Sequence, residues 1–157
     1  MRLMARGKSL GMNPYMAIAI AEAEAAGDRG EVPVGAVVVK AGTVLARAGN
    51  RVEEWCDPTA HAEILALRAA AEAQGEPRLP GCELWVTLEP CPMCAAAISF
   101  ARIQRLHFGA YDPKGGGVDH GSRVFDHSTC HHRPEVVGGV EERRTADLLK
   151  AFFRNLR

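Results

Sequence analysis

Two short segments of the 157-residue chain combine residue types that bind metals and move protons. The first contains His61 and Glu63, and the second is Pro90–Cys94, with cysteines at positions 91 and 94. Because these cysteines are three residues apart, both thiols point the same way in the first turn of a helix. A helix N-terminus lowers the pKa of a thiol and favours the metal-binding thiolate. With the imidazole of His61, the two thiolates form a three-ligand set for a tetrahedral zinc ion.

Glu63 distinguishes a catalytic zinc site from a structural one. Three protein ligands leave the fourth position of a tetrahedral ion to water, which is typical of catalytic zinc. Glu63 follows His61 by two residues at an expected helix start, where a long side chain can reach a pocket beyond the helix end. A carboxylate there can carry the protons of an activated water without binding the metal. We therefore predict His61, Cys91 and Cys94 as zinc ligands and Glu63 as the catalytic proton carrier.

The cysteines also allow other interpretations. A lone Cys-x-x-Cys pair occurs in redox sites and in halves of structural zinc sites. The segment His120–His132 contains four histidines and Cys130, and could complete a structural site with Cys91 and Cys94. The chain has an odd total of five cysteines and no secretory signal before them, which favours a reducing compartment. We accordingly expect a cytoplasmic protein.

The expected elements place both motifs at helix starts. Asn13 and Pro14 are typical of a helix beginning, and Gly27 is typical of a helix end. The full predicted order is helix Pro14–Ala26, strands Val32–Lys40 and Thr43–Ala48, a helix capped by Thr59 and running to Ala73, strand Leu84–Leu88, helix Cys91–Ala101, strands Arg105–Ala110 and Val136–Val140, and helix Glu141–Asn155. This alternation predicts a three-layer α/β/α fold around a central mixed sheet, with the ligand site where helices begin beyond strand ends.

Length and composition fit one globular domain, with 47% apolar and 24% charged residues. We expect residues 1–12 to be a flexible lead-in and residues 13–157 to form a single domain. No apolar run approaches the roughly 18 residues of a membrane span, so we expect no membrane partner. The formal net charge is zero, which by itself argues against a nucleic-acid partner. However, residues 101–157 hold 10 basic and 7 acidic side chains, so the basic charge gathers in the C-terminal third.

The motifs resemble those of bacterial tRNA-specific adenosine deaminases, within the cytidine-deaminase-like superfamily. His61-Ala62-Glu63 and Pro90-Cys91-x-x-Cys94 match the signature of zinc-dependent nucleobase deaminases, which does not select a substrate. Three further stretches favour the tRNA enzymes: Thr87–Cys91, Phe108–Gly116 and Phe152–Arg154. The resemblance extends from about Pro14 to the C-terminus.

This resemblance implies hydrolytic deamination of the wobble adenosine of a tRNA anticodon to inosine, with release of ammonia. It also implies a homodimer that contains one zinc ion per subunit and binds the anticodon stem-loop. The base-contacting asparagine of the family corresponds to Asn50, whose amide suits a purine edge, although a turn residue after a strand is the alternative. Asp112, Lys114, Phe153 and Arg154 are further candidates for substrate binding. For Lys114 and Arg154, phosphate contact and ordinary surface solvation are equal alternatives.

Two other functions stay open. The zinc motifs also fit a deaminase of a free base or nucleoside, such as guanine, cytosine or cytidine. A non-catalytic zinc module that binds RNA is the second alternative. Glu63 argues against this module, since a structural zinc site has no use for an adjacent carboxylate.

Overall fold

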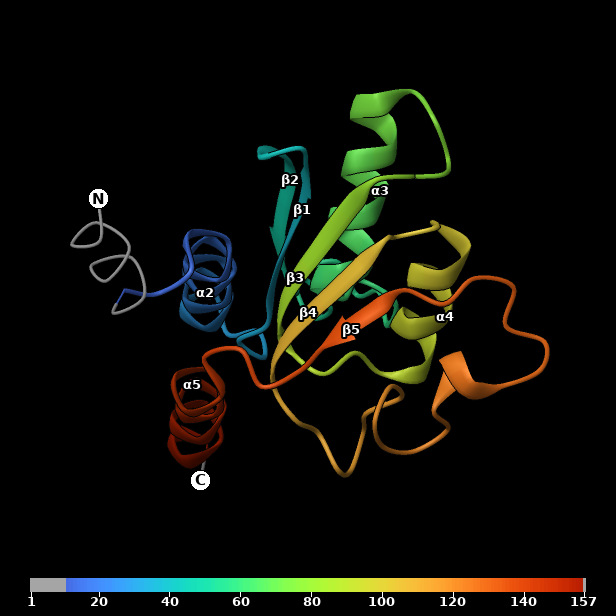
Figure 1. The fold of residues 1–157 in the computed structure, drawn as a ribbon. Helices are drawn as coiled ribbons and strands as arrows, with labels where there is room; N and C mark the ends of the chain where they lie inside the picture. The colour runs from blue at the N-terminus through green and yellow to red at the C-terminus, as the bar shows by residue number, and fades with distance from the viewer. Residues whose placement is uncertain (1–10, 157) are drawn as a thin grey trace, which may run out of the picture.

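A computed structural model describes residues 11–156 (Figure 1). The expected lead-in, residues 1–12, therefore lies almost entirely outside the described part of the chain. The elements in order are α2 (Pro14–Asp28), β1 (Gly35–Lys40), β2 (Thr43–Gly49), α3 (Ala62–Gln74), β3 (Cys82–Leu88), α4 (Pro92–Phe100), β4 (Arg105–Ala110), the 3-10 helix η1 (Val124–Asp126), β5 (Glu135–Val137) and α5 (Glu142–Asn155). None of the helices in this described part is both long and apolar enough to cross a membrane.

The strands form one mixed sheet in the order β2-β1-β3-β4-β5. Strand β1 is antiparallel to both β2 and β3, whereas β3, β4 and β5 are parallel to one another. Helices α2 and α5 cover one face of this sheet, and α3 and α4 cover the other (Figure 1). The expected three-layer α/β/α fold is confirmed.

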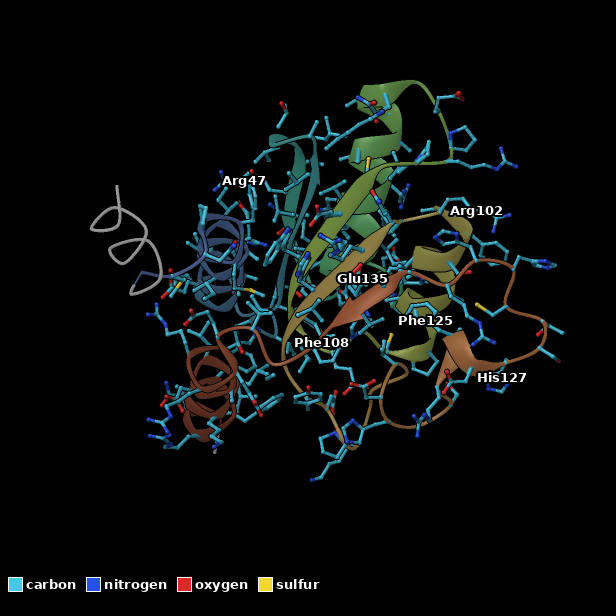
Figure 2. The ribbon with its side chains drawn as sticks, in the orientation of Figure 1. Arg47, Arg102, Phe108, Phe125, His127 and Glu135 are labelled. Atoms are coloured by element: carbon cyan, nitrogen blue, oxygen red, sulfur yellow. The ribbon has the colours of Figure 1, made fainter. Side chains whose placement is uncertain are left out.

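Apolar side chains fill both faces of the sheet. Between the sheet and α3 and α4 lies the larger cluster, which includes the fully buried Leu84, Ile98 and Phe108. Phe125 of η1 joins this cluster, and Figure 2 labels Phe108 at β4 and Phe125 near α4. The apolar cluster between the sheet and α2 is smaller. Gly35 lets α2 approach the sheet closely there, because a Cβ at this position would overlap the backbone of α2.

The start of α3 differs from the prediction. Thr59 was expected to cap this helix, but its side chain donates instead to Asp57 Oδ1, at 2.7 Å, and the helix begins only at Ala62. His61 therefore occupies the capping position. The Asp57–Thr59 turn competes with helix formation, as Asp and Thr side chains often do.

Two strands are also shorter than predicted. Strand β1 begins at Gly35 rather than Val32 because Pro33 has no N–H for the ladder and Val34 donates its own N–H to the carbonyl of Val32. Strand β5 ends at Val137 rather than Val140. The chain turns there through Gly138 and Gly139, the latter with a φ of 77°.

His107 of β4 is a buried titratable group on the α2 face. Its ring stacks on Trp85 with a centroid distance of 3.5 Å and an interplanar angle of 4°. Its Nε2 lies 2.8 Å from Glu83 Oε1. Burial lowers the pKa of His107 below its ordinary value. The carboxylate of Glu83 opposes this shift because it favours the charged imidazole, and the charge of Arg105 adds a smaller lowering effect.

This lowered pKa makes a pH-dependent contribution to stability. The unfolded chain binds a proton at His107 at a higher pH than the folded chain does, so His107 favours folding above about pH 6.5 and loses this effect as the pH falls. We expect the free energy of unfolding of the wild type to fall relative to that of His107→Gln as the pH is lowered from 8 to about 5. Urea unfolding at several pH values measures this difference. Parallel pH curves for the two proteins would contradict the prediction.

Candidate metal centre and substrate pocket

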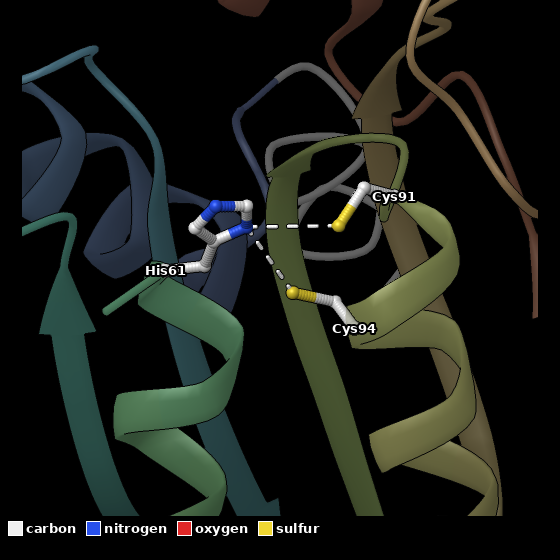
Figure 3. Close-up of side chains that lie close together, drawn as sticks. All are labelled: His61, Cys91 and Cys94. Carbon is white, nitrogen blue, oxygen red and sulfur yellow. Dashed lines mark hydrogen bonds between the residues drawn. The ribbon is translucent and has the colours of Figure 1, made fainter. Parts of the chain in front are cut away.

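Three predicted ligand atoms converge where α3 and α4 begin (Figure 3). His61 precedes the first residue of α3, and Cys91 precedes the first residue of α4. The Nδ1 atom of His61 lies 3.6 Å from Cys91 Sγ and 3.5 Å from Cys94 Sγ. All three ligand atoms lie within 4.8 Å of one another. In residues 11–156, no other group of three or more potential ligands comes this close.

These spacings fit a tetrahedral zinc ion. Zinc–sulfur bonds of about 2.3 Å and zinc–nitrogen bonds of about 2.0–2.1 Å, at a tetrahedral angle, separate N and S by about 3.5 Å. The two His61–cysteine distances match this value. Cys130, which could have completed a structural site, instead donates to the carbonyl of His132 and lies beside Ser99. The segment His120–His132 therefore contributes no ligand atom to this group.

The electrostatics of the group favour the metal-binding thiolate form of Cys91. A hydrogen bond from Cys94 lowers the pKa of Cys91 to about 4, and this thiolate in turn raises the pKa of Cys94. The hydrogen bond with Cys91 also raises the pKa of His61. One thiolate thus forms readily, and a dication bound beside it would deprotonate the second thiol.

Glu63 lies beside these ligands in the first turn of α3 and is only 4% exposed. Burial raises the pKa of Glu63 to about 7, against the opposing effect of the His61 charge. A carboxyl group with such a pKa can both take up and release a proton near neutral pH. Its position next to the ligands therefore suits proton transfer.

A pocket of about 650 Å³ opens onto this group. His61, Glu63 and Cys91 line it together with three of the predicted substrate-binding residues, namely Asn50, Asp112 and Phe153. Lys114 and Arg154, the other two, do not line the pocket. Several other lining residues were given no role from the sequence, among them Glu31, Val52, Glu89 and Leu156.

Comparisons with known proteins bear directly on this arrangement. The sequence profile of the MafB19-like deaminase family matches residues 12–157. The chain belongs to this deaminase family. It is 58% identical over 143 residues to a tRNA-specific adenosine deaminase of Agrobacterium fabrum, covering 91% of this chain and 94% of the relative. It is 47% identical to the enzyme of the same name from Bacillus subtilis, covering 91% and 89%.

Solved structures agree with this family assignment. One, from studies of A-to-I editing by tRNA:A34 deaminases at the wobble position of transfer RNA, has a TM-score of 0.85 and 58% sequence identity. The match covers 86% of this chain and 98% of the other. A guanine deaminase from Bacillus subtilis gives a TM-score of 0.61 and 39% identity over 64% of this chain and 66% of that one. The resemblance stated from the motifs is thus confirmed.

Asn50 connects the pocket of this deaminase to the start of α3. Its Oδ1 accepts the N–H of Ala62 at 2.7 Å, and its Nδ2 donates to the carbonyl of Val32 at 3.1 Å. Asn50 therefore provides the cap that His61 does not, since the His61 side chain makes no capping hydrogen bond. One N–H of the amide is not used by these two bonds.

Two buried carboxylates hold the loops around the pocket. Glu31 accepts the N–H groups of Glu53 and Glu54, at 3.1 and 2.8 Å, in the loop after Asn50. Glu89 accepts several N–H groups from the loop after β4. These bonds hold the pKa of Glu89 below its ordinary value, although burial opposes ionisation. No local sequence pattern marks either residue, because their partners lie 22 or more positions away.

The two bonds of Asn50 predict a measurable loss of stability. We expect Asn50→Ala to lower the free energy of unfolding by about 2 kcal/mol, because it removes a helix cap and one of the two hydrogen bonds that the carbonyl of Val32 accepts. Asn13→Ala is the matched control, since Asn13 caps α2 through Tyr15 and Met16 far from the pocket. It should cost about 1 kcal/mol. Urea unfolding that shows no greater loss for Asn50→Ala would contradict this account.

Proposed function

We propose that this chain is a zinc-dependent deaminase that converts the wobble adenosine of a tRNA anticodon to inosine and releases ammonia. The observation that carries the proposal is the convergence of His61, Cys91 and Cys94 beside a pocket that the buried Glu63 also lines. The names of the relatives support the choice of substrate. The predicted roles of the site residues are part of this proposal.

The chemistry follows from the positions of these side chains. His61, Cys91 and Cys94 would hold a zinc ion, which when bound would supply an activated water as nucleophile. Glu63 accepts a proton from this water and delivers it to N1 of the adenine as the water oxygen bonds to C6. Glu63 then moves the second proton of the water to the departing amino group. The C6–N bond breaks, and water and adenosine become inosine and ammonia.

An adenine in an anticodon loop suits this pocket better than one in a duplex, since an unpaired base leaves its stack at small cost. The remaining N–H of Asn50 can donate to the purine. Asp112 and the exposed Phe153 line the pocket that the base would enter. Lys114 and Arg154 lie outside the pocket and are exposed, which suits contacts with phosphates of the flanking nucleotides.

We propose further that the protein is a cytoplasmic homodimer with one zinc ion in each subunit, and that residues 13–157 form its single domain. The outer surface of α3 and α4 supports the dimer. It carries a groove of about 510 Å³ lined mostly by apolar side chains, among them Phe100, which is 72% exposed. A large exposed aromatic next to an apolar groove is typical of a protein–protein interface.

Two substitutions separate proton transfer from metal binding. Glu63→Gln should keep zinc at the wild-type stoichiometry but lose inosine formation by at least about 100-fold, because the amide cannot carry the proton. Cys91→Ser should lose both zinc and activity, because a serine hydroxyl is a poor replacement for a thiolate. Metal analysis of the purified proteins and an inosine assay provide the readouts. Substantial activity in Glu63→Gln, or full zinc occupancy in Cys91→Ser, would refute the corresponding role.

The substrate itself is tested by comparing an anticodon stem-loop with free nucleosides and bases. We expect inosine from the stem-loop and little ammonia from adenosine, guanine, cytosine or cytidine at equal concentration. Faster release of ammonia from a free base or nucleoside would assign the chain to that class of deaminase. A protein that binds zinc and the stem-loop but never forms inosine would be a non-catalytic module.

A further inference from the structure

The segment from Asp112 to His120, here called the pocket loop, forms one wall of the substrate pocket through Asp112 and Gly115. It follows β4 directly and contains no helix or strand. A segment without regular structure needs other contacts to keep a fixed position. The pocket loop obtains them from the residues that lead into the metal motif.

Glu89 is the centre of these contacts, and its side chain is fully buried. Its Oε1 accepts the N–H of Asp112 at 3.0 Å and lies 2.8 Å from Nδ1 of His120. Its Oε2 accepts three consecutive N–H groups, those of Val118, Asp119 and His120, at 3.2, 2.9 and 3.0 Å. One carboxylate thus joins the two ends of the pocket loop.

The glycines of the pocket loop allow it to lie directly on the metal motif. A Cβ at Gly116 would come within 2.5 Å of Glu89 Oε2, and a Cβ at Gly117 would come within 2.6 Å of the Pro92 nitrogen. The N–H of Gly117 also donates to the carbonyl of Pro90 at 2.8 Å. Since Cys91 lies between these two prolines, the loop is fixed relative to a predicted metal ligand.

We propose that Glu89 is a positioning residue, which holds the pocket loop at the distance from the metal centre that the substrate strand requires. This inference rests on the proposed function, because it concerns how that substrate is held. Although Glu89 belongs to the pocket lining, its carboxylate is fully buried and is bonded to the loop. It acts through the loop, and its loss therefore impairs substrate binding more than metal binding.

Glu89→Gln tests this role with little change in volume. A glutamine has one acceptor oxygen, and its NH₂ group would face N–H groups that have no other partner. We expect unchanged zinc content, faster hydrogen exchange at the N–H groups of Val118 and Asp119, and a loss of about 100-fold in kcat/KM for the stem-loop, mainly through KM. Glu83→Gln is the control, because it makes the same chemical change at the other end of β3 and should leave all three quantities unchanged.

Gly116→Ala provides a second test that leaves the carboxylate in place. The added methyl group would push the pocket loop away from Glu89, so KM should rise while zinc content stays constant. Gly27→Ala is its control, because a Cβ there meets only Pro33 at an ordinary distance of 3.4 Å. This variant decides the question if Glu89→Gln does not fold.

Several results would overturn the proposal. One is a test variant in which hydrogen exchange of the loop N–H groups and KM both equal those of the wild type. The others are a loss of zinc in Glu89→Gln and a fall in kcat with an unchanged KM. Failure of the proposed function is a separate outcome, in which the wild type itself forms no inosine. The exchange measurement needs no substrate and would still report whether Glu89 holds the loop.

Discussion

The capping positions of α3 and α4 are occupied by His61 and Cys91, and neither side chain makes a capping hydrogen bond. A helix start leaves several N–H groups without partners and carries partial positive charge. Asn50 takes the N–H of Ala62, which leaves the imidazole of His61 for a metal ion. The positive end of α4 favours the thiolate form of Cys91, whose pKa is lowered. The arrangement of the whole sheet serves to bring these two helix starts together.

The walls of the pocket are held in place by buried carboxylates. Glu31 and Glu89 are each 2% exposed, and both accept backbone N–H groups of neighbouring loops. An ionised carboxylate is a strong acceptor, and several such bonds offset its loss of hydration. Each loop is thereby fixed without a helix or strand of its own. The pocket combines carboxylates that fix its shape with one, Glu63, to which we assign proton transfer.

The sequence was sufficient for the order of the strands and α-helices, although not for the 3-10 helix η1, and for the four residues that converge at the candidate metal centre. Both depend on local patterns, namely apolar periodicity and residue types at helix starts. The start of α3 was missed because Asp57 binds the Thr59 side chain, and sequence alone does not show which of two hydrogen bonds is formed. The role of Glu89 was missed because its partners lie 23 to 31 residues further along the chain. Likewise, nothing local indicated that Asp112 lines the pocket whereas Lys114 does not.

The central claim is that water, activated beside Glu63, replaces the amino group of an adenosine in an RNA loop. The most direct measurement is deamination of the anticodon stem-loop in water enriched in oxygen-18, followed by mass spectrometry of the released nucleosides. The account predicts inosine that carries one solvent oxygen and one ammonia released for each inosine formed. Inosine without the label, or no inosine from a zinc-loaded and folded protein, would contradict it.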